Sequence, residues 1–91
     1  GVVVSIVVVD RQTGRLESVP EIVTRGVAEG EAAATLNEQA GQLLAETIEA
    51  RPAEERRDIE ATRERVRQAL RRFLRKRTQQ RPLVVPVVME V

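Results

Sequence analysis

The chain contains no cysteine, histidine, tryptophan or tyrosine, and Phe73 is its only aromatic residue. The missing cysteines exclude disulfides and thiolate metal sites, and the missing histidines remove the usual general base and the commonest metal ligand. The near-absence of aromatic rings removes the platforms on which proteins usually stack the bases of single-stranded RNA. The core must therefore be aliphatic, and enzymes that depend on His or Cys chemistry are excluded.

The remaining residues offer no other catalytic arrangement. The five glycines form no phosphate-binding motif. Ser5 and Ser18 fall in expected strands without a neighbouring base, and the carboxylates are scattered over expected helix surfaces and loops. Scattered carboxylates of this kind are typical of a solvated surface. The sequence therefore predicts a chain that is not an enzyme by itself and that holds no metal or cofactor.

A membrane-spanning segment is also missing. The run Val2–Val9 is far shorter than the ~20 apolar residues that a membrane helix needs. Ninety-one residues suffice for one small domain. Because the chain starts at Gly1 and enters an apolar run at once, we expect residues 1–91 to be a single accessory C-terminal domain, excised from a larger chain.

Two strands are expected near the start of the chain. Val2–Val9 is rich in β-branched residues, has no helical period and suits a strand covered on both faces. Asp10-Arg-Gln-Thr-Gly14 supplies turn chemistry, with glycine where a positive φ is tolerated. Leu16–Thr24 then predicts the second strand of a β-hairpin, weakened by Pro20 and its polar neighbours.

Helical periodicity appears twice after a connector over residues 25–34. Residues 33–50 predict the first helix, with a capping box at Thr35-x-x-Glu38. Asp58 is a suitable N-cap for the second helix, and Pro82 ends that element. The expected apolar faces are Leu36, Ala40, Leu43, Leu44, Thr47 and Ile48 in the first helix and Ile59, Val66, Ala69, Leu70, Phe73 and Leu74 in the second.

The third strand is expected at Leu83–Val91, and proline placement indicates the strand order. Proline cannot donate to a ladder, so Pro20 and Pro86 mark the second and third strands as edges. The sequence therefore predicts an α+β fold of β-β-α-α-β order. Its three-stranded mixed sheet has the order 2-1-3, with the third strand parallel to the first and a two-helix hairpin on one face.

The other sheet face would be partly bare, although the first strand is apolar on both sides. Exposed apolar patches of this kind mark interaction sites. We therefore expect another subunit, or another domain of the parent protein, to cover this face through Val2, Val4 and Val8. Arg25, after the second strand, and Arg77, near the apolar stripe of the second helix, are further interface candidates; both also fit an ordinary surface role.

Charge is distributed unevenly along a chain whose net charge is only +1. Residues 56–81 hold eleven cations and three acids, a local net charge of +8. Residues 28–55 hold seven acids and one cation. This asymmetry suits a polyanionic partner, and it also suits simple matching of the helix dipoles.

The basic arc of the second helix is the one candidate nucleic-acid surface. It consists of Arg63, Arg67, Arg71, Arg72, Arg75 and Lys76. Arginine favours bidentate phosphate contacts. The alternative is a solvated arc that only aids solubility. Without stacking rings, any RNA contact should be electrostatic and independent of base sequence.

Several segments together carry a family resemblance. They are Gly1-Val-Val-Val4, Asp10–Gly14, Pro20–Gly26, Asp58, Ala69–Leu74, Arg77-Thr78, Arg81-Pro82 and Pro86–Val91. In this order and spacing they resemble the C-terminal end of ribonuclease J, a bacterial RNase of the metallo-β-lactamase type. Residues 27–57 match that family poorly, and Val27-Ala-Glu-Gly30 stands where the family tends to have aromatic residues.

The resemblance implies a bacterial, cytoplasmic enzyme of RNA maturation and decay, with endonuclease and 5′→3′ exonuclease activity. Its catalytic part, a β-lactamase-like core with a β-CASP insertion, uses two zinc ions and an activated water. None of those catalytic residues lies in this chain. For the chain itself, the resemblance implies a small sheet backed by two helices, with its own catalytic domain, further copies of itself and RNA as candidate partners.

Two hypotheses of different class follow. In the first, the chain is a structural module whose bare sheet face or edge strand supports oligomerisation or inter-domain packing. In the second, it is an RNA-binding module that uses the basic face of the second helix. The apolar first strand favours the first hypothesis, and the +8 segment favours the second.

Overall fold

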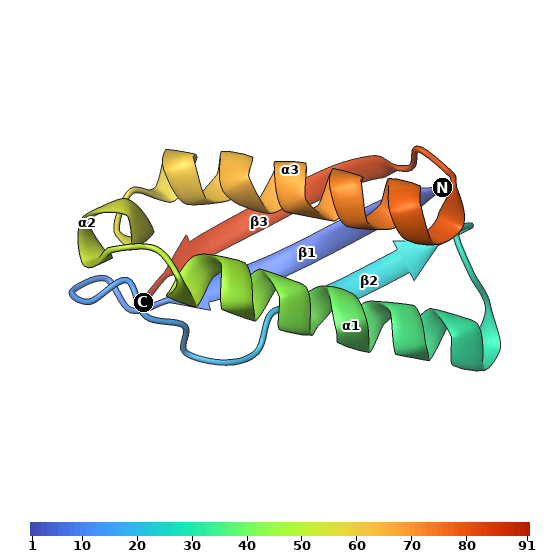
Figure 1. Cartoon of the computed structure of the whole chain (residues 1–91). Coiled ribbons are helices and arrows are strands. Elements are labelled where there is room, and N and C mark those ends of the chain that lie inside the picture. Colours follow the sequence, from blue (N-terminus) through green and yellow to red (C-terminus); the bar gives the residue numbers. More distant parts are fainter.

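The computed structural model describes residues 1–91 and forms two layers, a sheet and a layer of helices (Figure 1). The elements in chain order are β1 (Val2–Val9), β2 (Glu21–Arg25), α1 (Gly30–Glu49), α2 (Ala53–Arg56), α3 (Ile59–Thr78) and β3 (Leu83–Glu90). The long helices α1 and α3 run antiparallel across the same face of the sheet. The predicted α+β architecture, with a three-stranded mixed sheet backed by a helix hairpin, is confirmed.

Strand β1 lies in the centre of the sheet, in the order β2-β1-β3. It pairs antiparallel with β2, from Val2 opposite Arg25 to Ile6 opposite Glu21. It pairs parallel with β3 over its whole length, beginning with Val2 opposite Leu83. The helices form the crossover that a parallel pair requires. The predicted order is thus confirmed.

Alternation along β1 separates a buried face from an open one. Val3, Ser5, Val7 and Val9 point toward the helices and are almost completely buried. They join one continuous core of fourteen apolar side chains, whose largest members are Leu44, Ile48, Leu70 and Leu74. Phe73 packs against the edge of this core. The chain therefore has a hydrophobic core of its own, as an independently folding domain requires.

The second strand is shorter than the sequence predicted. The prediction was Leu16–Thr24, whereas β2 begins at Glu21. Leu16 forms only an isolated bridge with Val9, and the chain leaves the ladder between them because Pro20 has no N–H to donate. Pro20 therefore precedes the edge strand, whereas Pro86 lies within the edge strand β3 as predicted.

The start of the first helix was also predicted wrongly. Helix α1 begins at Gly30, with Glu29 as an N-cap that makes no side-chain hydrogen bond. The predicted capping box of Thr35 and Glu38 therefore lies inside the helix. The sequence prediction also missed α2, a single turn that starts directly after Pro52. Proline is pre-organised for a first helical turn, so the same residue ends one helix and starts the next.

The predicted cap of the second long helix is confirmed. The Asp58 carboxylate accepts a hydrogen bond from the Ala61 amide at 3.1 Å, which satisfies one of the free N–H groups at the start of α3. At the other end, Gln79 adopts a left-handed conformation with φ of 59° and donates its N–H to the Arg75 carbonyl. This stop turns the chain sharply toward β3.

Candidate interaction surfaces

The first candidate surface is the sheet face that no helix covers, called the open face below. The register of the two ladders places its members side by side. They are Val2, Val4, Ile6 and Val8 from β1, Glu21, Val23 and Arg25 from β2, and Leu83, Val85, Val87 and Met89 from β3. Apart from Glu21 and Arg25, every one of these side chains is apolar.

Exposure confirms that part of this apolar face meets solvent. Leu83 is 62% exposed, Met89 is 46% exposed and Val85 is 38% exposed. The apolar side chains of β1 are shielded in part by their neighbours in the flanking strands. Contiguous apolar surface of this kind is uncommon on isolated soluble domains and marks interaction sites.

The sequence prediction found only part of the open face. Val2, Val4 and Val8 lie on it, as their alternation in β1 indicated. Ile6 belongs to the same row but was missed, although the same alternation points to it. The contributors from β3, such as Val85 and Met89, were missed because their side depends on the β1–β3 register, which is a long-range property.

The two predicted arginine contacts lie in different places. Arg25 pairs opposite Val2 and lies at one end of the open face. Arg77 lies on the helix layer instead, where its guanidinium sits over the Phe73 ring at 5.0 Å and donates to the Gln39 side chain of α1. Arg77 therefore connects the two long helices within the chain.

The second candidate surface is the basic arc of α3, and its six predicted residues divide into two groups. Arg63 pairs with Glu60, and Arg67 pairs with Glu64, each one helical turn away. The ion pair with Arg67 lowers the pKa of Glu64, chiefly through its hydrogen bond, so that carboxylate stays ionised. The N-terminal half of the arc is therefore largely neutralised.

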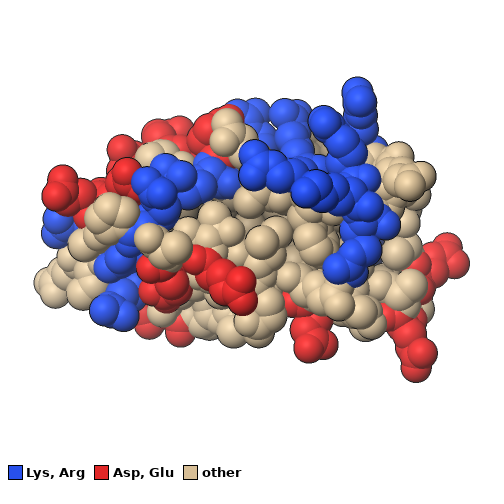
Figure 2. Space-filling model, in the orientation of Figure 1, with Lys and Arg blue, Asp and Glu red and all other residues tan.

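The C-terminal half of the arc carries free positive charge. Arg71, Arg72, Arg75 and Lys76 make no ion pair within the chain. Residues 71–81 contain six cations and no acid. Figure 2 shows these side chains as a continuous blue band over α3, while red side chains gather elsewhere on the same face. The sequence prediction did not include Arg81, which lies beyond the helix.

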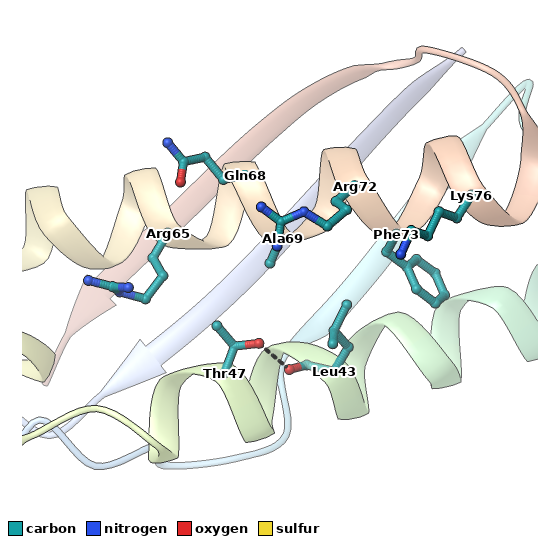
Figure 3. Close-up of a pocket in the computed structure, with 8 residues that line it drawn as sticks. All are labelled: Leu43, Thr47, Arg65, Gln68, Ala69, Arg72, Phe73 and Lys76. Carbon is teal, nitrogen blue, oxygen red and sulfur yellow. Dashed lines mark hydrogen bonds between the residues drawn. The ribbon is translucent and has the colours of Figure 1, made fainter.

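A shallow groove with a volume of about 450 Å³ runs between the two long helices (Figure 3). Its apolar floor is formed by Leu43, Ala69 and Phe73, and α3 supplies its cationic rim. Because the Arg77 guanidinium already lies over the Phe73 ring, that side of the only aromatic ring in the chain is taken. The groove therefore offers no free aromatic platform on that side for stacking a base.

No group of three or more acidic side chains gathers in a way that could hold a metal ion. The two zinc ions that the sequence resemblance implies would also find no His or Cys ligand in this chain. The residues present therefore do not fit that metal centre. None of the helices combines the length and the hydropathy that crossing a membrane requires.

The fold and its surfaces define a small α+β domain with one open apolar sheet face and one cationic helix. The whole chain, residues 1–91, matches the family model described as the ribonuclease J C-terminal domain, and the chain belongs to that family. This domain is not the catalytic part of the enzyme.

Two relatives illustrate the match. Ribonuclease J2 of Bacillus subtilis (strain 168) is 29% identical over 91 residues, which are 100% of this chain and 16% of the relative. Ribonuclease J 2 of Staphylococcus aureus (strain NCTC 8325 / PS 47) is 26% identical over the same share of both chains. The chain thus spans 16% of the length of the curated relatives that it matches.

Proposed function

We propose that residues 1–91 are the accessory C-terminal domain of a cytoplasmic, zinc-dependent ribonuclease of the J type, and that the domain supports assembly of the enzyme through its open face. The family membership supports the parent activity. The observation that carries the assembly role is the row of apolar side chains that both ladders align on a face without covering helices. The catalytic chemistry and its zinc ions belong to other parts of the enzyme.

A second copy of the same domain is the occupant that the open face favours. Strand β2 places Glu21 and Arg25 at the two ends of this face, with Val23 between them. When two open faces pack with their β2 strands antiparallel, Glu21 of one copy lies opposite Arg25 of the other, on both sides of the two-fold axis. The face is therefore complementary to itself in charge as well as apolar. The catalytic body of the parent enzyme is the other candidate occupant.

Sedimentation velocity of the 91-residue chain over a range of micromolar concentrations tests this proposal. We expect a monomer–dimer equilibrium that persists at high salt, because apolar contacts are not screened. A chain that remains monomeric throughout would contradict self-association and leave the catalytic body as the remaining partner.

A charge swap tests the proposed orientation. Arg25→Glu alone should weaken dimerisation by roughly threefold to tenfold, because each of two rim ion pairs becomes a repulsion. The double variant Glu21→Arg/Arg25→Glu should restore the wild-type dimerisation constant, since the opposite charges again face each other. If the double variant is weaker than the single one, the antiparallel arrangement is wrong.

RNA binding through α3 is the alternative function. The specific observation that favours it is the stretch 71–81, which holds six cations and no acid. Such a surface would contact phosphates and ignore base identity. The two functions are compatible because the open face and α3 lie on opposite sides of the sheet.

Fluorescence anisotropy with a 5′-labelled single-stranded RNA at two salt concentrations tests the alternative. We expect Arg71→Glu/Arg75→Glu to lower the affinity and to reduce the slope of log K against log salt by about two, one for each lost phosphate contact. The matched control is Arg11→Glu/Arg15→Glu, which makes the same change in net charge on the β1–β2 loop. Equal losses in both variants would mean that only net charge matters and that α3 is no binding surface.

A further inference from the structure

A small cavity lies where α3 ends and the chain turns toward β3. It has a volume of about 270 Å³, and no apolar side chain from the core reaches its wall. Its wall consists of Arg71, Arg75, Gln80, Arg81 and Pro82. Three of these five residues are therefore arginines, and two of the three lie one turn apart on the helix.

The helix stop creates this convergence. The left-handed Gln79 donates its N–H to the Arg75 carbonyl at 2.9 Å, and the Gln80 N–H bonds the Thr78 hydroxyl at 3.1 Å. These two hydrogen bonds fold the segment 79–82 back against the last turns of α3. As a result Arg81, which lies outside the helix, lines the same cavity as Arg71 and Arg75.

None of these three guanidinium groups has an acidic partner in the chain. The four ion pairs of the protein involve other arginines. Glu64 feels the charge of Arg71 only weakly, because its main partner is Arg67. Like charges that line one cavity repel each other, and a bound anion would relieve that repulsion.

Helix-dipole matching does not account for the cluster. Cations in the last turn of α3, Arg75, Lys76 and Arg77, already complement the negative end of the helix. Arg81 lies beyond that turn, yet it lines the cavity together with Arg71 and Arg75. An anion held between the helix and the following loop explains the arrangement of all three.

We propose that this cavity is a phosphate-binding pocket, in which Arg71, Arg75 and Arg81 coordinate one phosphate group. Guanidinium groups pair with phosphate oxygens in a bidentate manner, and three of them can engage all the free oxygens of a single phosphate. The Gln80 side chain lines the same pocket and adds a neutral donor. The pocket contains no carboxylate that would compete with the anion.

A neighbouring surface indicates how a longer polyanion would continue. A second cavity is lined by Gln68, Arg71, Arg72, Arg75 and Lys76, so it shares Arg71 and Arg75 with the first. Two adjacent anion positions with common arginines suit successive phosphates of one backbone, whereas free phosphate would occupy the first pocket alone. The inference rests on the proposed RNA alternative only for the source of the phosphate and not for its chemistry.

The test is an NMR titration of the ¹⁵N-labelled 91-residue chain with inorganic phosphate at low salt, in which arginine Nε–Hε and backbone signals are followed. We expect the largest shifts at Arg71, Arg75, Gln80 and Arg81. Arg81→Gln should weaken phosphate binding by about tenfold, which is the usual value of one charge-assisted contact. Its matched control, Arg72→Gln, removes the same charge from α3 outside the pocket and should change phosphate affinity by less than about twofold.

A second arm of the same experiment uses a short oligonucleotide. If phosphate comes from a nucleic-acid backbone, Arg72→Gln should weaken the oligonucleotide while sparing inorganic phosphate, and Arg81→Gln should weaken both. If inorganic phosphate binds but the oligonucleotide does not, the pocket stands as a small-phosphate site and the RNA alternative fails. Shifts spread equally over all arginines, including Arg11, or equal losses in the two variants, would overturn the pocket.

Discussion

Val4→Asp should abolish dimerisation of the domain at micromolar concentrations. Val4 lies in the centre of the open face, between Val23 and Val85 in the two flanking strands. In the proposed dimer an aspartate there would be buried against apolar side chains of the second copy without a partner for its charge. An uncompensated charge in such an interface costs about 3–5 kcal/mol, which corresponds to at least a hundredfold weaker association.

Val19→Asp is the matched control for this variant. Val19 is 60% exposed and lies in the loop before β2, outside the open face, so the same substitution there should leave the dimer intact. Sedimentation velocity reports association, and circular dichroism melting reports whether Val4→Asp still folds. A folded Val4→Asp chain that dimerises as tightly as the wild type would remove the open face as the assembly surface.

Leu70→Ala should produce the largest loss of stability among single truncations. Leu70 is 0% exposed in the second half of the core, where α3 faces the sheet. Removing its side chain from a packed site costs about 2–5 kcal/mol, through lost burial and the cavity left behind. Domains of this size have only about 5–15 kcal/mol in total, so the variant should be close to unfolding. Urea unfolding followed by circular dichroism measures the difference.

Leu43→Ala separates the cavity effect from the effect of the substitution itself. Leu43 also lies in a long helix, α1, but its side chain lines the open groove and is only half-buried. The same Leu→Ala change should therefore cost much less, because less area returns to water and no closed cavity forms. Equal losses for the two variants would mean that α3 and α1 are packed equally well and that the core is not centred where the buried side chains indicate.

The general fold could be predicted because its strongest signals are local. The β-branched run in β1 and the spacing of apolar residues in α1 and α3 each define an element within a few residues. Pro86 placed β3 correctly at an edge. Pro20 gave the correct order for an incomplete reason, since it precedes β2 and shortens it. The single turn α2 was missed because four residues carry no periodicity.

The candidate surfaces were predictable to a smaller extent, and the reason is the range of the interactions. The pairs of Arg63 with Glu60 and Arg67 with Glu64 lie three residues apart, so helix geometry could have separated them from the free cations. Arg81 could not be assigned in this way, because only the fold of the loop after α3 brings it to Arg71. Met89 on the open face likewise depends on pairing with Val8 across the sheet.

The parallel pairing of β1 with β3 has a consequence for the order of folding events. The longest ladder of the sheet joins Val2 to Leu83 and Val9 to Glu90, so it can close only after both helices have been synthesised and have reversed the chain. Closing such a distant pair carries the entropy of the whole intervening chain, which slows the folding of non-local topologies. Until β3 arrives, β1 can pair only with the short β2 and leaves one apolar edge unsatisfied. The nascent domain is thus exposed to aggregation until its last strand has left the ribosome.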